Sequence, residues 1–596
     1  MNSVDNLWQA VQVMVRSLPP RRRRQAFLTL ILMLVGAAAE MLSVSAVYAF
    51  LTFLTRQAEV TGGAVSWNPL LRWIPKGANL LMIVTIGFVI VMLVTGVIRL
   101  ALTWMTNSFS VNAGVDMSAA AFRKVTAQPY KFYLNTGTSE ILSRFEKIQF
   151  TMIIIASGVQ ALVSSVVATM IIVFLLLLNF WIAVTLGSVL IGSYALISYF
   201  GQATLVRNSE IVARALGERV QHIQQAIGGI RDILLDHSQW VFQRDFERTG
   251  NHLRRPQVVN SFMVWAPRSV IESVGMTAIA LVTVGFSSDK GGFIAALPVM
   301  GGLAIGAQRL VPLLQQSYYG WSSFFGSRET FLEVAGLLAL PESTVSGPAA
   351  AELSFRSTVE FNDVSFGYTV DQAVLQSVNL RIRKGERIGI VGSTGSGKTT
   401  LTDLILGLLM PSQGRIIVDG RLLDQHTMAA WQAQVAHVPQ AIYLSDDTIA
   451  RNIAFGIIRN EVDMALVETA AKSAGLHDFI LSLPEQYETR CGERGIRLSG
   501  GQRQRIGIAR ALYKRATVLV LDEATSALDN ATERAVMESI SGLSSSITVI
   551  MVAHRLSSLS ECHRILQVDH GLVTEVDHVS AGIAPDLTVG NSAQEQ

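Results

Sequence analysis

Charged residues are scarce in this chain of 596 residues. They make up 16% of the sequence, against roughly 25% in an ordinary soluble protein. Hydrophobic residues reach 50%, and together the two figures predict that a large part of the chain lies in lipid. The formal net charge is only +3, so we expect no nucleic-acid partner.

Cysteine is also rare. Cys491 and Cys562 are the two cysteines of the chain, and they show neither a metal-ligand spacing nor a disulfide framework, which suits a reducing cytosol. A cleavable signal peptide is not expected either. The basic stretch Arg21–Arg24 precedes an apolar run of nearly 30 residues, which is too long for a signal sequence and long enough to span a bilayer.

Apolar runs fill the first 325 residues. Residues 148–206 form 59 positions without one charged side chain, which corresponds to roughly 90 Å of helix and therefore to two crossings. We expect a turn between these crossings near 179–181. Four further runs lie at 26–54, 79–106, 261–286 and 292–318. The pattern predicts six membrane spans.

Basic residues indicate the orientation of these spans. The segments 109–147 and 207–256 carry five and eight Lys or Arg, whereas 55–78 and 287–291 carry four between them. The basic side is therefore expected to be cytoplasmic, with both chain ends on it. We expect the membrane helices to continue into the cytosol, joined by short transverse helices near 131–142 and 228–236.

The composition changes after about residue 340. Residues 341–354 form a Pro/Ser/Ala-rich linker, and beyond it short β-branched runs alternate with helical stretches, which favours a parallel α/β domain. The expected organisation is a cytoplasmic N-terminus (1–25), an all-α six-helix transmembrane domain (26–340), the linker, an α/β P-loop nucleotide-binding domain (355–578) and a disordered tail (579–596).

A phosphate-binding loop lies at the start of this domain. It follows the apolar strand RIGIV, precedes a helical stretch, and matches G-x-x-x-x-G-K-[ST]. Its backbone N–H groups are expected to surround phosphate oxygens, Lys398 to bind the β- and γ-phosphates, and the Thr399 hydroxyl to bind Mg²⁺. The predicted ATP-binding residues here are Gly392, Ser393, Thr394, Gly395, Ser396, Gly397, Lys398, Thr399 and Thr400.

Other residues complete the predicted ATP site. The apolar stretch VLVLDE ends in Asp522, a ligand for Mg²⁺, and Glu523, which is placed to orient the attacking water. Gln440 offers a neutral ligand to the metal and the water. His554 ends the next apolar stretch and is expected to reach the γ-phosphate, and Tyr368 is expected to stack on adenine. Glu523, His554 and Gln440 are the predicted catalytic residues.

A glycine-rich motif shortly before Asp522 suits a helix N-terminus that faces phosphate. It consists of Leu498, Ser499, Gly500, Gly501 and Gln502. With the phosphate loop, Gln440, Asp522–Glu523 and His554, this order resembles the nucleotide-binding domain of ABC transporters. The resemblance also covers a D-loop formed by Ser526, Ala527, Leu528 and Asp529.

With six preceding spans, the whole chain resembles a half-transporter of the type IV ABC exporters. The resemblance implies an ATPase that uses ATP and Mg²⁺ and lies in the bacterial inner membrane with its nucleotide-binding domain in the cytoplasm. It also implies a dimer in which LSGGQ of one chain closes over the ATP of the other. Because no motif is degenerate, we expect a homodimer.

Three arginines interrupt the apolar runs. Arg99, Arg268 and Arg309 each lie about 25–30 Å from the outer end of their span, if each residue adds about 1.5 Å. One hypothesis is a basic belt that binds the phosphate or pyrophosphate of a lipid headgroup. The alternative is structural, with Glu272 neutralising Arg268 and Glu40 pairing with another, which leaves one positive charge per chain.

Several stretches resemble the lipid-linked oligosaccharide flippases of bacterial protein N-glycosylation. They are AEMLSVSAVYAFLTF in the first run, SEIL at 139–142, APRSVIES, QRLVP, and an aromatic outer loop at 66–77 expected to form a short interfacial helix. The resemblance implies transfer of a polyprenyl-pyrophosphate glycan from the inner to the outer leaflet. The alternatives are export of another amphiphile, such as lipid A, a drug or a peptide, and a regulated channel or sensor, for which no long insert is visible.

Overall fold

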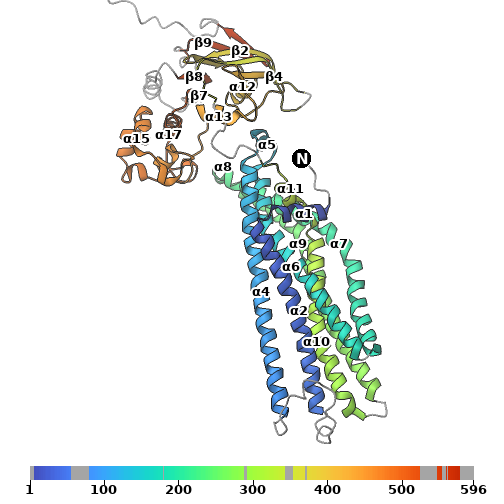
Figure 1. Cartoon of the computed structure of the whole chain (residues 1–596). Helices are drawn as coiled ribbons and strands as arrows, with labels where there is room; N and C mark the ends of the chain where they lie inside the picture. The colour runs from blue at the N-terminus through green and yellow to red at the C-terminus, as the bar shows by residue number, and fades with distance from the viewer. Residues whose placement is uncertain are drawn as a thin grey trace, which may run out of the picture. The chain divides into compact units, whose positions relative to one another are not determined.

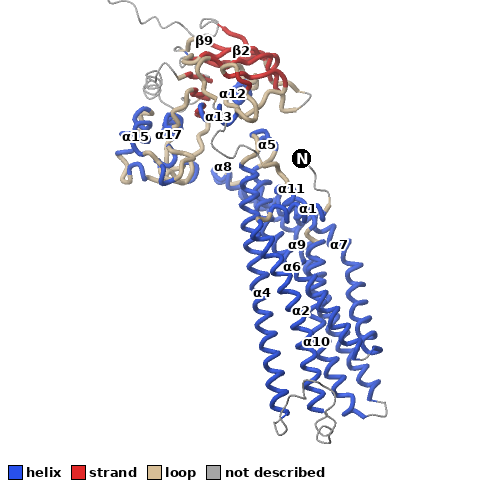
Figure 2. The backbone as a smooth tube through the Cα atoms, viewed as in Figure 1, coloured by secondary structure: helices blue, strands red, loops and turns tan. Residues whose placement is uncertain are grey.

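The computed structural model describes residues 6–55, 80–178, 180–287, 292–342, 353–369, 372–523, 547–552, 559 and 562–576. The chain divides into two compact units: one comprises residues 1–128 and 133–343, and the other residues 129–132 and 344–596. In Figures 1 and 2 the first unit is a bundle of long helices, and the second contains the strands.

Within the described residues the first unit has six helices of 34 to 49 residues. The elements are α1 (Leu7–Ser17), α2 (Pro20–Thr55), α4 (Leu80–Thr126), α5 (Tyr130–Asn135), α6 (Thr138–Leu178), α7 (Phe180–Gly228), α8 (Ile230–Leu235), α9 (Gln239–Ser287), α10 (Gly292–Phe325) and α11 (Arg328–Leu338). Three of the described helices are long and apolar enough to cross a membrane: α2, α4 and α6 over Pro20–Val47, Met82–Thr126 and Thr138–Val173. The number of six spans stays a prediction.

The boundaries of the long helices agree with the expected pattern. The uncharged stretch 148–206 is divided where α6 ends at Leu178 and α7 begins at Phe180. The charged segments 109–147 and 207–256 largely continue the long helices α4, α6, α7 and α9, as predicted, and the short helices α5 and α8 lie where transverse helices were expected. Pro20 begins α2, a position where the missing N–H of proline costs no hydrogen bond.

Helices α6 and α10 pack unusually closely. A Cβ added to Gly320 of α10 would lie 2.4 Å from the Ala161 Cβ and 2.4 Å from the Ser157 carbonyl oxygen of α6. Polar side chains join the same two helices, since Ser164 Oγ donates to Gln316 Oε1 at 2.7 Å. The absence of a side chain at Gly320 therefore allows direct backbone approach.

Helix α11 is held by three neighbouring helices of the bundle. Lys124 Nζ of α4 donates to the Leu338 carbonyl at 2.6 Å. Lys147 of α6, which is buried, pairs with Glu333 of α11 and donates to the Ala213 carbonyl of α7 at 3.3 Å. Phe331 is fully buried, so α11 is attached by both packing and charge.

The second unit contains two sheets. The elements are β1 (Thr358–Phe366), β2 (Leu375–Arg383), β3 (Arg387–Val391), α12 (Lys398–Ile405), β4 (Gln413–Val418), β5 (Arg421–Leu422), α13 (Met428–Gln434), β6 (Val435–Val438), α14 (Ile449–Ile453), α15 (Met464–Ser473), α16 (His477–Leu481), α17 (Gly500–Tyr513), β7 (Val518–Asp522), β8 (Thr548–Val552), β9 (Arg564–Asp569) and β10 (Leu572–Val576), with 3-10 turns at Arg459–Glu461, Gln486–Glu488 and Glu493–Gly495.

The larger sheet has the order β10-β9-β3-β8-β7-β6, in which β10 alone pairs antiparallel among the described strands. Its parallel core confirms the predicted α/β class. The second, antiparallel sheet, β2-β1-β4-β5, was not predicted. Its strands β1 and β2 alternate buried and exposed side chains over most of their length, as expected when one face of a sheet is covered.

Candidate functional site

The phosphate loop lies between β3 and α12. Gly392 has a φ of +154°, and a Cβ there would lie 2.2 Å from the Val568 carbonyl oxygen. Gly397 has a φ of +111° directly before the first residue of α12. Both positions disfavour any side chain, so these two glycines of the motif are explained by backbone geometry.

Lys398 folds back onto its own loop. Its Nζ donates to the carbonyl oxygens of Gly392 at 2.7 Å and Ser393 at 2.8 Å. The Ser396 hydroxyl is buried and has no hydrogen-bond partner among the described residues. A buried hydroxyl without a partner is unfavourable, so this loop offers both a cation and an unsatisfied donor to phosphate oxygens.

Tyr368 lies beside the helix that follows the loop. Its hydroxyl is 3.2 Å from Thr400 Oγ1, and its ring makes an edge contact with Phe366 at a centroid distance of 5.1 Å. Thr399, which directly precedes Thr400, is exposed. The predicted adenine-stacking residue therefore contacts the immediate neighbour of the predicted metal-binding residue Thr399.

The predicted catalytic pair is assembled at the end of β7. Asp522 is the last residue of this strand, and Gln440 Nε2 donates to Glu523 Oε2 at 2.6 Å. Glu523 has a φ of +48°, an uncommon conformation for a residue with a side chain. The structure brings Gln440 and Glu523 together although 83 residues separate them.

Asp403 was missed by the sequence reasoning. It lies on α12, is buried, and burial together with the neighbouring Asp522 charge raises its pKa to about 6. The available signal was a carboxylate inside the otherwise apolar sequence LTDLIL. Its position places a second carboxyl group near the predicted metal ligand Asp522.

The glycine-rich motif starts helix α17, as predicted. Ser499 Oγ accepts from the Gln502 N–H at 3.2 Å, and Gln502 Oε1 accepts from the Ser499 N–H at 2.8 Å. This reciprocal capping leaves Gly500 and Gly501 in the first turn of the helix. His554 and the D-loop residues Ser526, Ala527, Leu528 and Asp529 lie outside the described residues, as does the outer loop 66–77.

The three membrane arginines all contact carboxylates. Arg268 Nε donates to Glu272 Oε1 at 2.9 Å, which is the predicted structural pairing. Glu40 of α2 contacts both Arg99 and Arg309. Its Oε1 accepts from Arg99 Nε at 2.9 Å, and its Oε2 pairs with Arg309 Nη1 at 3.3 Å. Three positive and two negative charges leave a net charge of +1.

Comparison with known proteins identifies the family of the chain. The ABC transporter family model matches residues 375–526, and the model for the ABC transporter transmembrane region matches residues 26–292. An ATP-dependent lipid A-core flippase of Cupriavidus metallidurans is 30% identical over 499 residues, which is 81% of this chain and 82% of the relative. A putative multidrug export ATP-binding/permease protein of Bacillus subtilis is 31% identical over 482 residues, 77% and 80% of the two chains.

A solved structure shares the fold. It is a bacterial Atm1-family ABC exporter with ATP bound, with a TM-score of 0.75 and 23% identity over 96% of this chain and 99% of that chain. The protein is thus an ATPase coupled to transmembrane transport, a multi-pass protein of the inner membrane with its nucleotide-binding domain in the cytoplasm. The chain belongs to the ABC transporter family, as a half-transporter of the type IV exporter architecture.

Proposed function

We propose that the protein moves a phosphorylated glycolipid from the inner to the outer leaflet. The observation that carries this proposal is the shared carboxylate of Glu40. One negative charge serves the two guanidinium groups of Arg99 and Arg309. This cluster therefore keeps an excess positive charge inside an apolar helix bundle.

An excess charge at this place is costly without an anionic partner. Ionisable groups within membrane segments are rare and mark functional sites. The side chain of Arg99 is 54% exposed, whereas that of Glu40 is 17% exposed. A phosphate oxygen is a strong acceptor for an exposed guanidinium and forms charge-assisted hydrogen bonds with it. Arg268, already paired with Glu272 by one helical turn, contributes less to this binding.

The names of the relatives support a lipid substrate. Several of the similar proteins are lipid A-core flippases, and others are a multidrug exporter and an ATM1-type heavy metal exporter that is 38% identical over 262 residues. Lipid A-core and polyprenyl-pyrophosphate glycans share a phosphorylated headgroup with sugars attached. That common chemistry is what the Glu40 cluster is suited to bind.

The ATP site is proposed to work with Mg²⁺. Thr399, Gln440 and Asp522 supply the oxygen ligands that this ion prefers. In nucleotide sites this ion is usually bound by one or two carboxylates together with the phosphates of the substrate. Mg²⁺ supplies charge neutralisation on the phosphates, while Lys398 binds them and Glu523 orients the water.

The proposed assembly is a homodimer. Every ATP-site motif is present in this one chain, so a two-fold pair of identical chains supplies two complete sites. In that pair, Ser499–Gly501 of one chain faces the ATP of the partner. Closure of the two nucleotide domains on ATP then shifts the membrane helices, because ATP binds the closed state more tightly.

A flipping assay in proteoliposomes tests the proposal. The protein is reconstituted with a fluorescent polyprenyl-pyrophosphate glycan or with labelled lipid A-core, and outer-leaflet exposure is followed with and without ATP. ATP-dependent transfer of either lipid supports the proposal and identifies the substrate. Transfer of neutral lipids or drugs alone, with neither phosphorylated lipid moved, contradicts it.

A further inference from the structure

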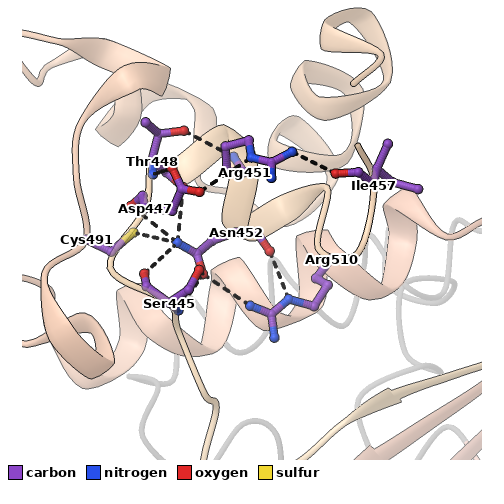
Figure 3. Close-up of polar contacts among 8 residues, drawn as sticks. All are labelled: Ser445, Asp447, Thr448, Arg451, Asn452, Ile457, Cys491 and Arg510. Carbon is purple, nitrogen blue, oxygen red and sulfur yellow. Dashed lines mark hydrogen bonds and ion pairs between the residues drawn. The ribbon is translucent and has the colours of Figure 1, made fainter. Parts of the chain in front are cut away.

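Arg510 connects helix α17 to the loop that follows Gln440. Its Nε donates to the Asn452 carbonyl oxygen at 2.9 Å (Figure 3). Both terminal nitrogens donate to the Tyr443 carbonyl oxygen at 3.1 Å. The guanidinium also lies over the ring of Phe455, 4.6 Å from its centroid. Arg510, on helix α17 that starts within the LSGGQ motif, thus contacts Tyr443, three residues after Gln440.

Asn452 fixes that loop from within. It is fully buried, and its Nδ2 donates to the carbonyl oxygens of Ser445 and Thr448, each at 3.1 Å. Its Oδ1 accepts from the Ser445 N–H at 3.0 Å. Its Nδ2 also donates to Cys491 Sγ at 3.4 Å (Figure 3). Hydrogen bonds to Asn452 therefore fix the segment 445–452, and Arg510 of α17 adds hydrogen bonds to this segment and to Tyr443 before it.

We propose that Arg510 is a positioning residue for ATP hydrolysis, which links the loop of Gln440 to the glycine-rich N-terminus of α17 so that the two move together. Gln440 contacts Glu523, while Ser499 caps the helix that carries Arg510. Any displacement of α17 is transmitted through Arg510 to the Gln440 loop.

The chemistry of Arg510 favours this role over one in stability. Its hydrogen bonds go to carbonyl oxygens, and in the described part of the chain its acceptors include no carboxylate. Arg510 is partly buried, and this desolvation lowers the pKa of its guanidinium. A neutral residue at this position would avoid the cost of desolvating the charge. A neutral residue lacks the planar guanidinium group, which donates to the carbonyl oxygens of Asn452 and Tyr443 at the same time.

Two variants and a control test the proposal in the full-length protein in nanodiscs. Arg510→Gln removes the charge and the fork, and Arg510→Lys keeps the charge without the fork. Arg505→Lys is the control, because Arg505 lies on the same helix and donates instead to the Gly475 carbonyl at 2.8 Å. Steady-state hydrolysis gives kcat, equilibrium binding without Mg²⁺ gives the Kd for ATP, and thermal unfolding gives Tm.

We expect Arg510→Gln to lower kcat about tenfold, equivalent to ~1.4 kcal/mol in the barrier. Arg510→Lys should lie between this variant and the wild type. The Kd for ATP should not change, because Lys398 and Tyr368 bind the nucleotide independently of this link, and Tm should stay close to the wild-type value. Arg505→Lys should keep the wild-type kcat.

Three results would overturn the proposal. The first is a wild-type kcat in Arg510→Gln, and the second is a parallel loss of kcat, ATP affinity and Tm, which indicates a structural role only. The third is an equal loss of kcat in Arg505→Lys. If Arg510→Gln does not fold, hydrogen exchange of residues 441–454 in Arg510→Lys decides: faster exchange supports the link, and unchanged exchange contradicts it.

Discussion

Gln440 and Glu523 form a 2.6 Å hydrogen bond in which the amide donates and the carboxylate accepts. The group predicted to orient water is thus already bound to the residue predicted to contact the metal. In the proposed mechanism one oxygen of Glu523 accepts a hydrogen bond from the attacking water. On the same proposal, the Gln440 loop, held by Arg510, sets the orientation of this carboxylate.

We expect Glu523→Gln to bind ATP normally and to hydrolyse it about 100-fold more slowly or worse, the usual range for loss of a general base. The amide keeps the shape of the side chain but does not accept a proton. ATPase turnover in nanodiscs and equilibrium ATP binding are measured together. Glu461→Gln, at an exposed carboxylate of the same domain, serves as the control, and near-wild-type turnover of Glu523→Gln would remove its assigned role.

We expect Arg309→Ala to lose lipid transfer by about tenfold or more, equivalent to ~1.4 kcal/mol, while basal ATP hydrolysis persists. The substitution leaves Glu40 with Arg99 alone, so the cluster becomes neutral and loses its attraction for an anion. Flipping and ATPase assays on the same proteoliposomes separate the two effects. Arg144→Ala, which breaks an ion pair with Glu140 elsewhere on the bundle, is the matched control, and equal lipid transfer by Arg309→Ala and wild type would contradict the headgroup site.

We expect Cys491 to react slowly with a maleimide at pH 7 to 9. Burial raises the pKa of this thiol to about 11, so at pH 9 only about 1% is the reactive thiolate. The labelling rate should therefore rise about tenfold per pH unit and level off only near pH 11, about two units above the pH at which an ordinary cysteine levels off. Mass spectrometry of the Cys562→Ser variant follows this one thiol, with denatured protein as the control for full labelling. Rapid labelling of the native protein at pH 7.5 would show that the site opens.

We expect Gly320→Ala to destabilise the bundle by about 1–3 kcal/mol, the usual cost of overpacking. The added methyl group would overlap Ala161 and the Ser157 carbonyl of α6. Gly96→Ala in α4 is the control, because nothing lies within 4 Å of a Cβ there. Thermal unfolding in detergent should show a lower Tm for Gly320→Ala alone, and equal Tm values for both variants would mean that α6 and α10 separate readily.

Much of this architecture was predictable because lipid and phosphate impose simple sequence patterns. The division of 148–206 into two helices followed from bilayer thickness, and the loop at Gly392–Thr399 followed from a motif with a fixed strand and helix on either side. The antiparallel sheet around β1 was missed, because short strands without an obvious hairpin turn give a weak periodic signal.

Side-chain partners were harder to foresee than helices. Glu40 lies 59 residues from Arg99 and 269 from Arg309, so only the packing of α2 against α4 and α10 brings them together. The pairing of Arg268 with Glu272 was predictable because it spans one helical turn. Arg510 of α17 contacts Asn452 of α14, which lies 58 residues earlier, and Tyr443, which lies 67 residues earlier, and nothing in local sequence indicates these contacts.

The attachment of α11 has a mechanical consequence. A pull on the polypeptide beyond Leu340 reaches α11 first, and the lysines at positions 124 and 147 spread that load over α4, α6 and α7. A force applied at α11 is then shared by three helices of the bundle. The bundle should therefore respond to such a force as a unit, and we expect substitution of either lysine to let one helix bend independently of the others.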